Sequence, residues 1–132
     1  MTQEDKILLL KDLSGRLQYN VQILADIDKT FEGGVIGTLK VINLKKDWVE
    51  LQNVLTPFKF DEIKPYLRPM SSMTREERKE YDSLFKLHED GNVYCENWEY
   101  FDWMNKHHFD CRDLISKGLA LEAPEVMYEI QD

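Results

Sequence analysis

Long hydrophobic runs are missing from this 132-residue chain. No apolar stretch approaches the roughly 18 residues that a membrane-spanning helix requires. The chain also opens with two acidic residues, Glu4 and Asp5, where a secretory signal would carry basic ones. We therefore expect a soluble protein of the cytoplasm that neither crosses nor binds a membrane.

Cysteine is also scarce, because Cys95 and Cys111 are the two in the chain. Two cysteines cannot build the dense disulfide framework of a small secreted protein. A thiol without an activating motif is more often a small packing residue than a nucleophile. We expect both cysteines to be free thiols in a reducing compartment.

Aromatic residues, in contrast, are plentiful: the chain contains three Trp, six Tyr and six Phe. Side chains of this size bury large apolar areas, which disfavours a disordered chain. The length of 132 residues is also typical of one domain with one core. We therefore expect residues 1–132 to form a single α+β domain.

The negative charge is concentrated in the last third of the chain. Residues 1–88 contain 14 basic and 14 acidic residues, whereas residues 89–132 contain three basic and eleven acidic ones. The net charge of −8 therefore arises entirely in residues 89–132. An acidic surface repels nucleic acid and attracts a basic partner, although it also serves simply to keep a protein in solution.

The first half of the sequence predicts a helix followed by a small antiparallel sheet. Apolar residues at helical spacing predict a helix over residues 3–15, which Thr2 caps and Gly15 ends. The apolar period then changes to two, which predicts strands separated by connections too short for parallel pairing. The predicted sheet has three to four strands, at residues 19–25, 35–41, 48–53 and, as a short edge strand, 58–60.

Two prolines mark the middle of the chain. Pro65 and Pro69 force the residues before them into extended backbone, so no helix can continue through this region. We expect residues 64–70 to form an extended strap that lies over the core.

The last half of the sequence predicts two to three helices. Thr74 and Glu77 match a capping box for a helix over residues 75–88. A turn at 90–91 and a short strand at 93–95 precede a second helix, which Asn97 caps. Asp110 would begin a third, short helix that ends at Gly118. The tail, residues 124–132, is expected to be loosely held.

Three stretches of the sequence resemble small proteins of gut Bacteroidales and of their phages and mobile elements. They are EDKILLLKDLS at residues 4–14, IKPYLRPMSSMT at 63–74, and HHFDCRDLI at 107–115 followed by GLALEAP at 118–124. The chain departs from the pattern at Cys111, where we expect an aromatic residue, and at Val126, where we expect glycine. The resemblance implies a bacterial, cytoplasmic protein of a phage or mobile element. It implies no activity, cofactor or site residue.

The helix after Asn97 is the strongest candidate for binding a partner. Trp98 and Phe101 share one side of this helix, and Tyr100 and Trp103 lie on another. A helix that is apolar on two sides is either buried between layers or exposed to a partner, and the sequence leaves both possibilities open. In the exposed case, the partner is another protein or a second copy of this chain. The predicted contact residues are Tyr100, Trp103, Lys106 and His107.

Two other functions stay open as alternatives. A single-stranded nucleic acid could stack on the sheet, although the negative charge of the chain opposes this. Its predicted contacts are Lys40, Lys45, Trp48 and Lys59. A metal-dependent enzyme could use His107 and His108, with Asp110 and Cys111 close in sequence.

The spacing of these metal-binding residue types is unfavourable. Adjacent histidines on a helix diverge by about 100°, and the chain contains no CxxC or HxxxH pair. No nucleophile elbow or glycine-rich phosphate loop is present either. We therefore expect a non-enzymatic accessory or interaction protein that needs no cofactor, and we assign it no catalytic or metal-binding residue.

Overall fold

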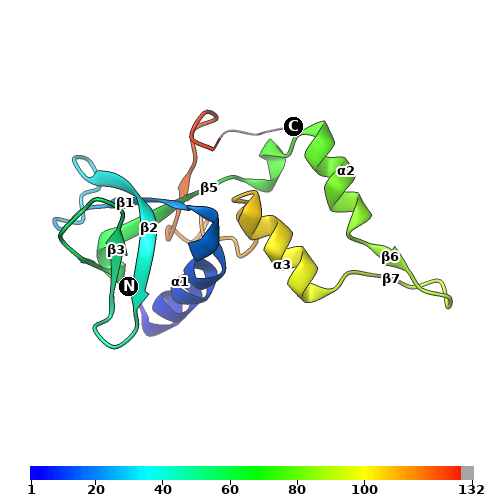
Figure 1. The fold of residues 1–132 in the computed structure, drawn as a ribbon, viewed down its shortest axis with the longest axis horizontal. Helices are drawn as coiled ribbons and strands as arrows, with labels where there is room; N and C mark the ends of the chain where they lie inside the picture. Colours follow the sequence, from blue (N-terminus) through cyan, green and yellow to red (C-terminus); the bar gives the residue numbers. More distant parts are fainter. Residues whose placement is uncertain (129–132) are drawn as a thin grey trace.

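A computed structural model describes residues 1–128 of the chain. These residues form three α-helices, a six-stranded mixed sheet and a separate two-stranded hairpin. The predicted α+β class is confirmed. Figure 1 shows the sheet and the first helix at one end of the molecule and the hairpin at the opposite end. No helix in residues 1–128 is long and apolar enough to span a bilayer.

The first helix, α1 (Gln3–Arg16), begins as its sequence predicts. The Thr2 side chain accepts a hydrogen bond of 3.0 Å from the Asp5 backbone N–H. The predicted stop at Gly15 is wrong, because the chain continues through a 3₁₀ turn (Leu17–Tyr19) to Asn20. Asn20 adopts the left-handed backbone that ends helices, with φ of 58°.

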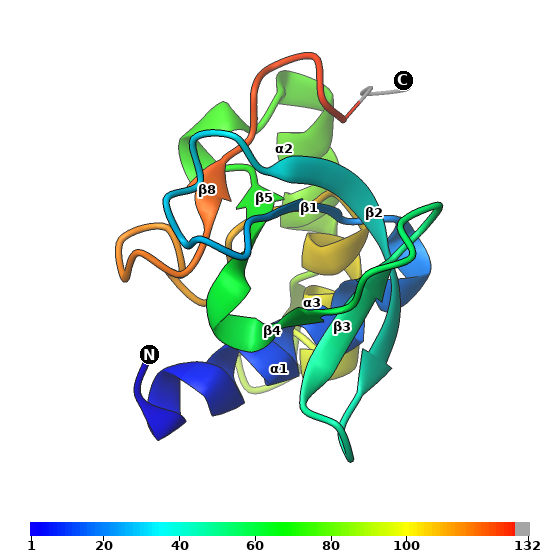
Figure 2. The ribbon, with the colours of Figure 1, turned by 90° about the vertical axis from the view of Figure 1, so that its left-hand side faces the viewer.

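The predicted meander is also present. It consists of β1 (Gln22–Ala25), β2 (Val35–Asn43), β3 (Trp48–Leu51) and the short edge strand β4 (Phe58–Lys59), paired antiparallel in this order. The sheet is larger than the predicted three to four strands, because β5 (Ile63–Leu67) and β8 (Leu121–Glu122) extend it beyond β1. β8 runs parallel to β5, so the sheet is mixed. Figure 2 shows how strongly its strands curve around the core.

The backbone of residues 64–67 is extended as predicted, but the expected strap over the core is wrong, because these residues belong to strand β5 of the sheet. Pro65 lies opposite Ile23 of β1. The Asp26 N–H donates to the Glu62 carbonyl, and bonded pairs alternate along an antiparallel ladder, so the pair of Ile23 and Pro65 is a non-bonded one. The missing N–H of Pro65 would therefore point away from β1, and β8 begins to pair only at Tyr66. Proline costs no ladder bond at this position.

The core lies between the concave side of the sheet and α1. Leu9 and Leu13 of α1 are fully buried there, together with alternate residues of the strands. The main core residues are Leu9, Leu13, Val21, Ile23, Leu39, Val49, Leu51, Phe58, Phe60, Ile63, Leu67 and Leu114.

The second half of the chain forms α2 (Arg75–Ser83), a hairpin of β6 (Lys86–Leu87) and β7 (Val93–Tyr94), and α3 (Asn97–Lys106). The capping box of α2 is present as predicted, with Thr74 and Glu77 bonded to each other's backbone. The prediction that this helix reaches residue 88 is wrong, because it ends at Ser83 and the chain enters β6. The cap of α3 is Glu96, whose side chain makes no capping bond, in place of the predicted Asn97.

The third C-terminal helix is not formed in the described residues, where 111–118 are turns. The Asp110 carboxylate nevertheless accepts hydrogen bonds from the backbone of Leu114 and Ile115, at 2.8 and 3.0 Å.

Hydrogen bonds attach the tail to the sheet at Tyr128, contrary to the prediction that residues 124–132 are loosely held. The Tyr128 hydroxyl accepts from the Gln22 N–H of β1 and donates to the Tyr66 carbonyl of β5, at 2.8 Å each. The rest of that prediction, residues 129–132, lies outside the described residues.

Candidate protein-interaction arm

Part of the second half of the chain projects from the sheet as an arm. We define the arm as residues 75–106, which comprise α2, the β6–β7 hairpin and α3. In Figure 1 the two helices lie side by side, and the hairpin extends beyond them on the side away from the sheet. The predicted partner-binding residues belong to the arm or, for His107, follow it directly.

A buried ion pair fixes the base of the arm to the sheet. Arg68, directly after β5, forms a bidentate pair with Glu77 of α2, with two N–O distances of 2.7 Å. Arg68 and Glu77 are 7% and 3% exposed. Burial raises the pKa of Glu77, but hydrogen bonds from Arg68 and the Thr74 N–H outweigh burial and lower this pKa to about 2. Glu77 is therefore a carboxylate at neutral pH, and α2 is held by charge-assisted bonds.

His107 and Trp103 extend this base between the two helices. The His107 ring lies between two carboxylates of α2, with Nδ1 3.1 Å from Glu77 and Nε2 3.5 Å from Glu80. The Trp103 ring packs on the His107 ring at a centroid distance of 4.4 Å, and its Nε1 donates to Glu80 at 3.2 Å. These two predicted contact residues therefore join α3 to α2.

Tyr100 takes part in the same helix-to-helix contact. The Tyr81 ring of α2 lies 6.3 Å from the Tyr100 ring and 5.8 Å from the Trp103 ring. Burial raises the pKa of the Tyr100 hydroxyl. α2 thus covers much of the second apolar side of α3, which the sequence left either buried or exposed. Lys106 is exposed, and contact of these four residues with a partner stays a prediction.

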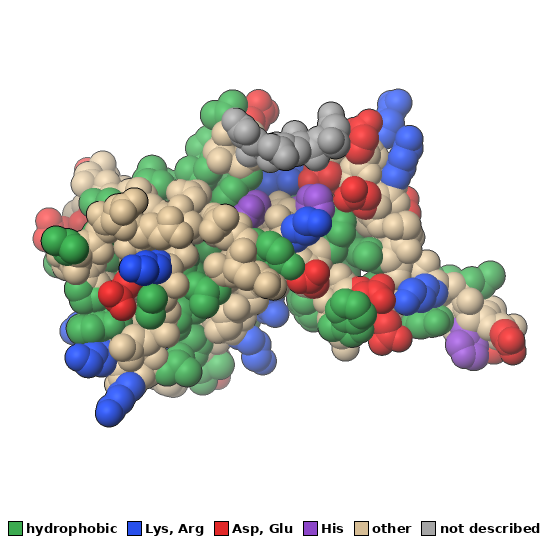
Figure 3. Space-filling view, viewed as in Figure 1, with side chains coloured by type: hydrophobic (Ala, Val, Ile, Leu, Met, Phe, Trp, Pro, Cys, Tyr) green, Lys and Arg blue, Asp and Glu red, His purple; other side chains and the backbone are tan. Residues whose placement is uncertain are grey.

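The exposed apolar residues of the arm lie farther out, around the hairpin. Leu87 of β6 and Val93 of β7 are 76% and 65% exposed, and Trp98 in the first turn of α3 is 69% exposed. Phe85 and Tyr94 beside them are also exposed. Figure 3 shows hydrophobic side chains on the narrow projection that the hairpin forms. A projecting element with this many open apolar side chains is typical of a docking surface.

The charges around these residues are mostly negative. Residues 84–102 contain five acidic side chains and one basic side chain, Lys86. Lys86 is paired with Glu99 at 3.2 Å, so its charge is partly neutralised. The acidic residues are Glu89, Asp90, Glu96, Glu99 and Asp102. The apolar end of the arm is therefore set in an acidic surface.

The candidate metal-binding residues each make a different contact in the structure. His107 faces α2, whereas His108 stacks on Tyr128 at a ring distance of 3.6 Å. Asp110 is used in backbone hydrogen bonds. In residues 1–128, no group of three or more His, Cys, Asp or Glu side chains is arranged to hold a metal ion.

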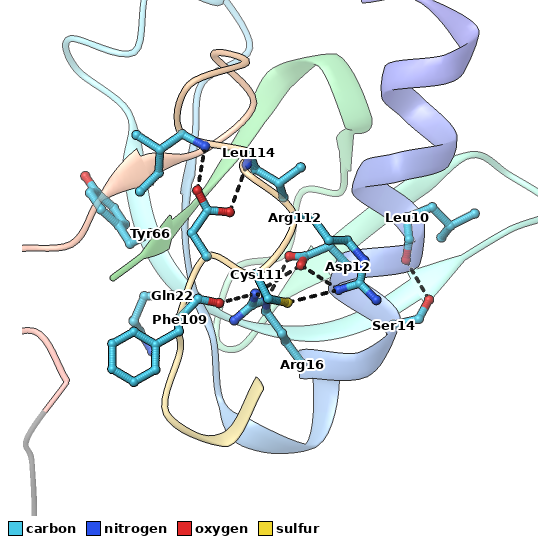
Figure 4. Close-up of polar contacts among 12 residues, drawn as sticks. Leu10, Asp12, Ser14, Arg16, Gln22, Tyr66, Phe109, Cys111, Arg112 and Leu114 are labelled. Atoms are coloured by element: carbon cyan, nitrogen blue, oxygen red, sulfur yellow. Dashed lines mark hydrogen bonds and ion pairs between the residues drawn. The ribbon is translucent and has the colours of Figure 1, made fainter. Parts of the chain in front are cut away.

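Cys111 lies beside a buried ion cluster instead. Figure 4 shows Arg16, Cys111 and Arg112 around the Asp12 carboxylate. Asp12 accepts from Arg16 Nε at 2.8 Å and from Arg112 Nη1 at 3.1 Å, and Arg16 also donates to the Phe109 carbonyl. Burial raises the pKa of the Cys111 thiol, so this thiol is less reactive than an ordinary one. The cluster joins α1 to the loop after α3.

The structure gives little support to the alternative that the sheet binds a single-stranded nucleic acid. Trp48 and Lys59 are cross-strand neighbours on the outer side of the sheet, as that alternative needs. The Lys46 ammonium already lies over the Trp48 ring, 5.0 Å from its centroid. Phe58 and Phe60, which would add stacking surfaces, are 5% and 3% exposed and belong to the core. Lys40 and Lys45 are exposed, but they add charge without a further ring.

Comparison of the chain with protein-family models, with curated protein sequences and with solved structures found no match. The resemblance to Bacteroidales and phage proteins therefore stays a prediction.

The sequence reasoning missed the hairpin residues, although a signal for them was present. Leu87 and Val93 flank a Glu89-Asp90-Gly91 turn symmetrically, and a three-residue loop with glycine is a typical hairpin pattern. The ion pair of Arg68 with Glu77 had no such signal, since it joins two elements whose relative position only the fold determines.

Proposed function

We propose that this chain is a non-enzymatic interaction protein that binds another protein through the hairpin end of its arm. The observation that carries the proposal is the exposure of Leu87 and Val93, 76% and 65%, on a two-stranded hairpin that extends away from the sheet. Neither residue contributes to the core, so their apolar character needs another explanation.

The marginal stability of an isolated hairpin supports the existence of a binding partner. Two-stranded hairpins are marginally stable in water by themselves, and they gain stability when another surface covers their apolar side. Burial of an exposed side chain such as Leu87, Val93 or Trp98 contributes on the order of 1 to 2 kcal/mol. Three such residues provide a typical anchor for a small interface.

The charge supports a partner with a basic surface. Glu89, Asp90, Glu96 and Glu99 lie close in sequence to the exposed apolar residues, and charged side chains of this kind form the polar rim of many interfaces. Opposite charge on the partner would accelerate association and would disfavour acidic competitors. A phage or mobile-element accessory protein that occupies a basic surface of a host protein fits this charge.

Photo-crosslinking tests the proposal directly. A photoreactive amino acid placed at Val93 should give, in the native host cells, a discrete covalent adduct with a second protein. The same probe at Leu44, which is 68% exposed in the β2–β3 turn, is the matched control. We expect an adduct from position 93 and none from position 44.

The double variant Leu87→Ser with Trp98→Ser should abolish the adduct from position 93 while the chain remains folded. Both side chains are exposed, so their replacement costs the fold little. Equal adducts from positions 93 and 44, or an adduct unaffected by the double variant, would contradict a docking role for the arm.

A further inference from the structure

The hairpin of the arm has two free edges. Its sheet consists of β6 and β7 alone within residues 1–128, so neither strand has an outer neighbour there. The strands pair antiparallel, with Lys86 opposite Tyr94 and Leu87 opposite Val93. A free strand edge presents unpaired N–H and C=O groups, which are a template for another strand.

The hydrogen-bond pattern shows which groups point outward. The His88 N–H donates to the Asn92 carbonyl at 2.7 Å, and the chain turns through Gly91 with φ of 91°. Because bonded pairs alternate along an antiparallel ladder, the next pair, Leu87 with Val93, is a non-bonded one. The N–H and C=O of Leu87 and Val93 therefore point to the two outer edges, where they can bind an added strand.

The two faces of the hairpin differ in chemistry. Cross-strand partners share a face, so Leu87 and Val93 lie on one face, and Lys86 and Tyr94 on the other. Successive side chains of an added strand would therefore lie alternately next to the apolar face and next to the polar face of the hairpin.

Charge distinguishes the two edges. Along the β6 edge, the polar face carries Lys86, whose charge is only partly neutralised by Glu99 and would disfavour a basic segment. Along the β7 edge, it carries Tyr94, and the exposed Glu96 follows two residues later at the start of α3. The aromatic ring of Tyr94 and the carboxylate of Glu96 both attract cations. The β7 edge therefore suits a basic partner, and the β6 edge does not.

We propose that β7 binds an extended basic segment of the partner protein as a third strand. This proposal rests on the proposed function and specifies its partner. The segment alternates apolar residues, which cover Val93, with Lys or Arg residues, which meet Tyr94 and Glu96. A second copy of this chain is the weaker occupant, because both copies would bring acidic arms and a net charge of −8 each.

A synthetic peptide that alternates lysine and valine is the probe. Titration into the isotope-labelled full-length protein, followed by amide NMR shifts and Trp fluorescence, should move residues 92–98 and leave the sheet unchanged. A peptide with glutamate in place of lysine should bind at least tenfold more weakly. A lysine and valine peptide methylated on the backbone nitrogens that would face β7 should also bind at least tenfold more weakly, because these nitrogens can no longer donate to β7.

Two proline variants locate the edge. Val93→Pro removes an outward N–H of β7 without removing a ladder bond, and Leu87→Pro is its matched control on β6. We expect Val93→Pro to lose at least tenfold in affinity and Leu87→Pro to bind as the parent does. Loss confined to Leu87→Pro, or no loss in either variant, would overturn strand addition to β7.

Glu96→Lys provides a readout that does not depend on proline tolerance. We expect this variant to weaken binding of the lysine peptide and to strengthen binding of the glutamate peptide, and an unchanged preference would overturn the charge assignment.

Self-association of the free protein that Val93→Pro abolishes would instead identify a second copy as the occupant. If crosslinks from the arm persist while the methylated peptide binds normally, strand addition fails and the docking role of the arm survives.

Discussion

At the residue scale, His108 shows how burial sets a protonation state. Its Nδ1 is buried and has no hydrogen-bond partner among residues 1–128, and its ring stacks on Tyr128 at 3.6 Å. Burial lowers the pKa of His108 to about 4, and the nearby Arg16 and Arg68 add to this effect. The imidazole is therefore neutral in the folded protein at physiological pH. His108 also takes left-handed backbone, with φ of 63°.

This lowered pKa predicts a loss of stability in mild acid. The unfolded chain binds a proton at His108 near pH 6.5, whereas the folded chain resists protonation down to about pH 4. The stabilising contribution of neutral His108 is thus complete above pH 6.5 and is lost as the pH falls from 6.5 to 4. Urea unfolding across this range should show a decrease on the order of 2 kcal/mol.

His108→Asn is the control for that pH dependence. Asparagine tolerates left-handed backbone and does not titrate, so the variant should be less stable at pH 7 but should lack the decline between pH 6.5 and 4. If the parent and the variant decline in parallel, other groups control acid stability and the assignment to His108 is wrong.

At the scale of elements, the contact between α1 and α3 depends on a glycine. A Cβ added at Gly15 would lie 2.4 Å from the Asn105 side-chain nitrogen, well inside van der Waals contact. Asn105 is 5% exposed and has little room to move. Gly15 therefore allows a close approach of α1 and α3.

Gly15→Ala should accordingly destabilise the protein, although alanine favours helices. The intrinsic gain of about 1 kcal/mol is opposed by overpacking that costs roughly 1 to 3 kcal/mol, so we expect a net loss in urea unfolding. Gly33→Ala is the matched control, because nothing lies within 4 Å of its added Cβ. In an Asn105→Ala background, Gly15→Ala should become stabilising. A stabilising effect in the parent chain would show that this contact is not tight.

The elements that were predicted correctly are those with a local signal. Thr2 caps α1, and the period-two residues of β1 and β3 face the core as expected. In β2 the expected alternation fails, because Val35 is 46% exposed and a bulge between Leu39 and Val41 shifts the register so that Ile42 packs on the core. Pro65 misled the prediction, because the sequence cannot show that its missing N–H falls between ladder bonds.

Other failures have the same tertiary origin. Residues 84–88 fit a helical period as well as a hairpin, and pairing of β6 with β7 decides between them. The Tyr128 hydroxyl bonds to Tyr66 of β5 and to Gln22 of β1, which lie 62 and 106 positions before it in the sequence. No local sequence pattern predicts contacts over such separations. The sequence pointed to Tyr100, Trp103, Lys106 and His107, whereas the most exposed apolar side chains of the arm lie at the hairpin and at Trp98.

At the scale of the whole molecule, core and arm differ in how they are held. The sheet and α1 share one continuous apolar core. The arm attaches through the Arg68–Glu77 pair, the aromatic contact of Trp103 with Phe109 and the close approach of α3 to α1 at Asn105 and Gly15. Its outer half has exposed strands and apolar side chains. We therefore expect local opening of the arm to cost much less free energy than unfolding of the sheet.

Amide hydrogen exchange measures this difference. The amides of β1 and β5 should exchange only through global unfolding, whereas those of residues 86–94 should exchange at least 100-fold faster, because their bonds are exposed to solvent. Glu77→Gln should accelerate exchange in α2 while it leaves β1 and β5 nearly unchanged, since it leaves the Arg68 charge buried without its partner. Asp82→Asn, which breaks only the exposed pair with Arg78, is the control and should change neither. Equal protection of α2, the hairpin and the sheet in the parent, or a uniform acceleration in Glu77→Gln, would show that the arm and the core unfold as one cooperative unit.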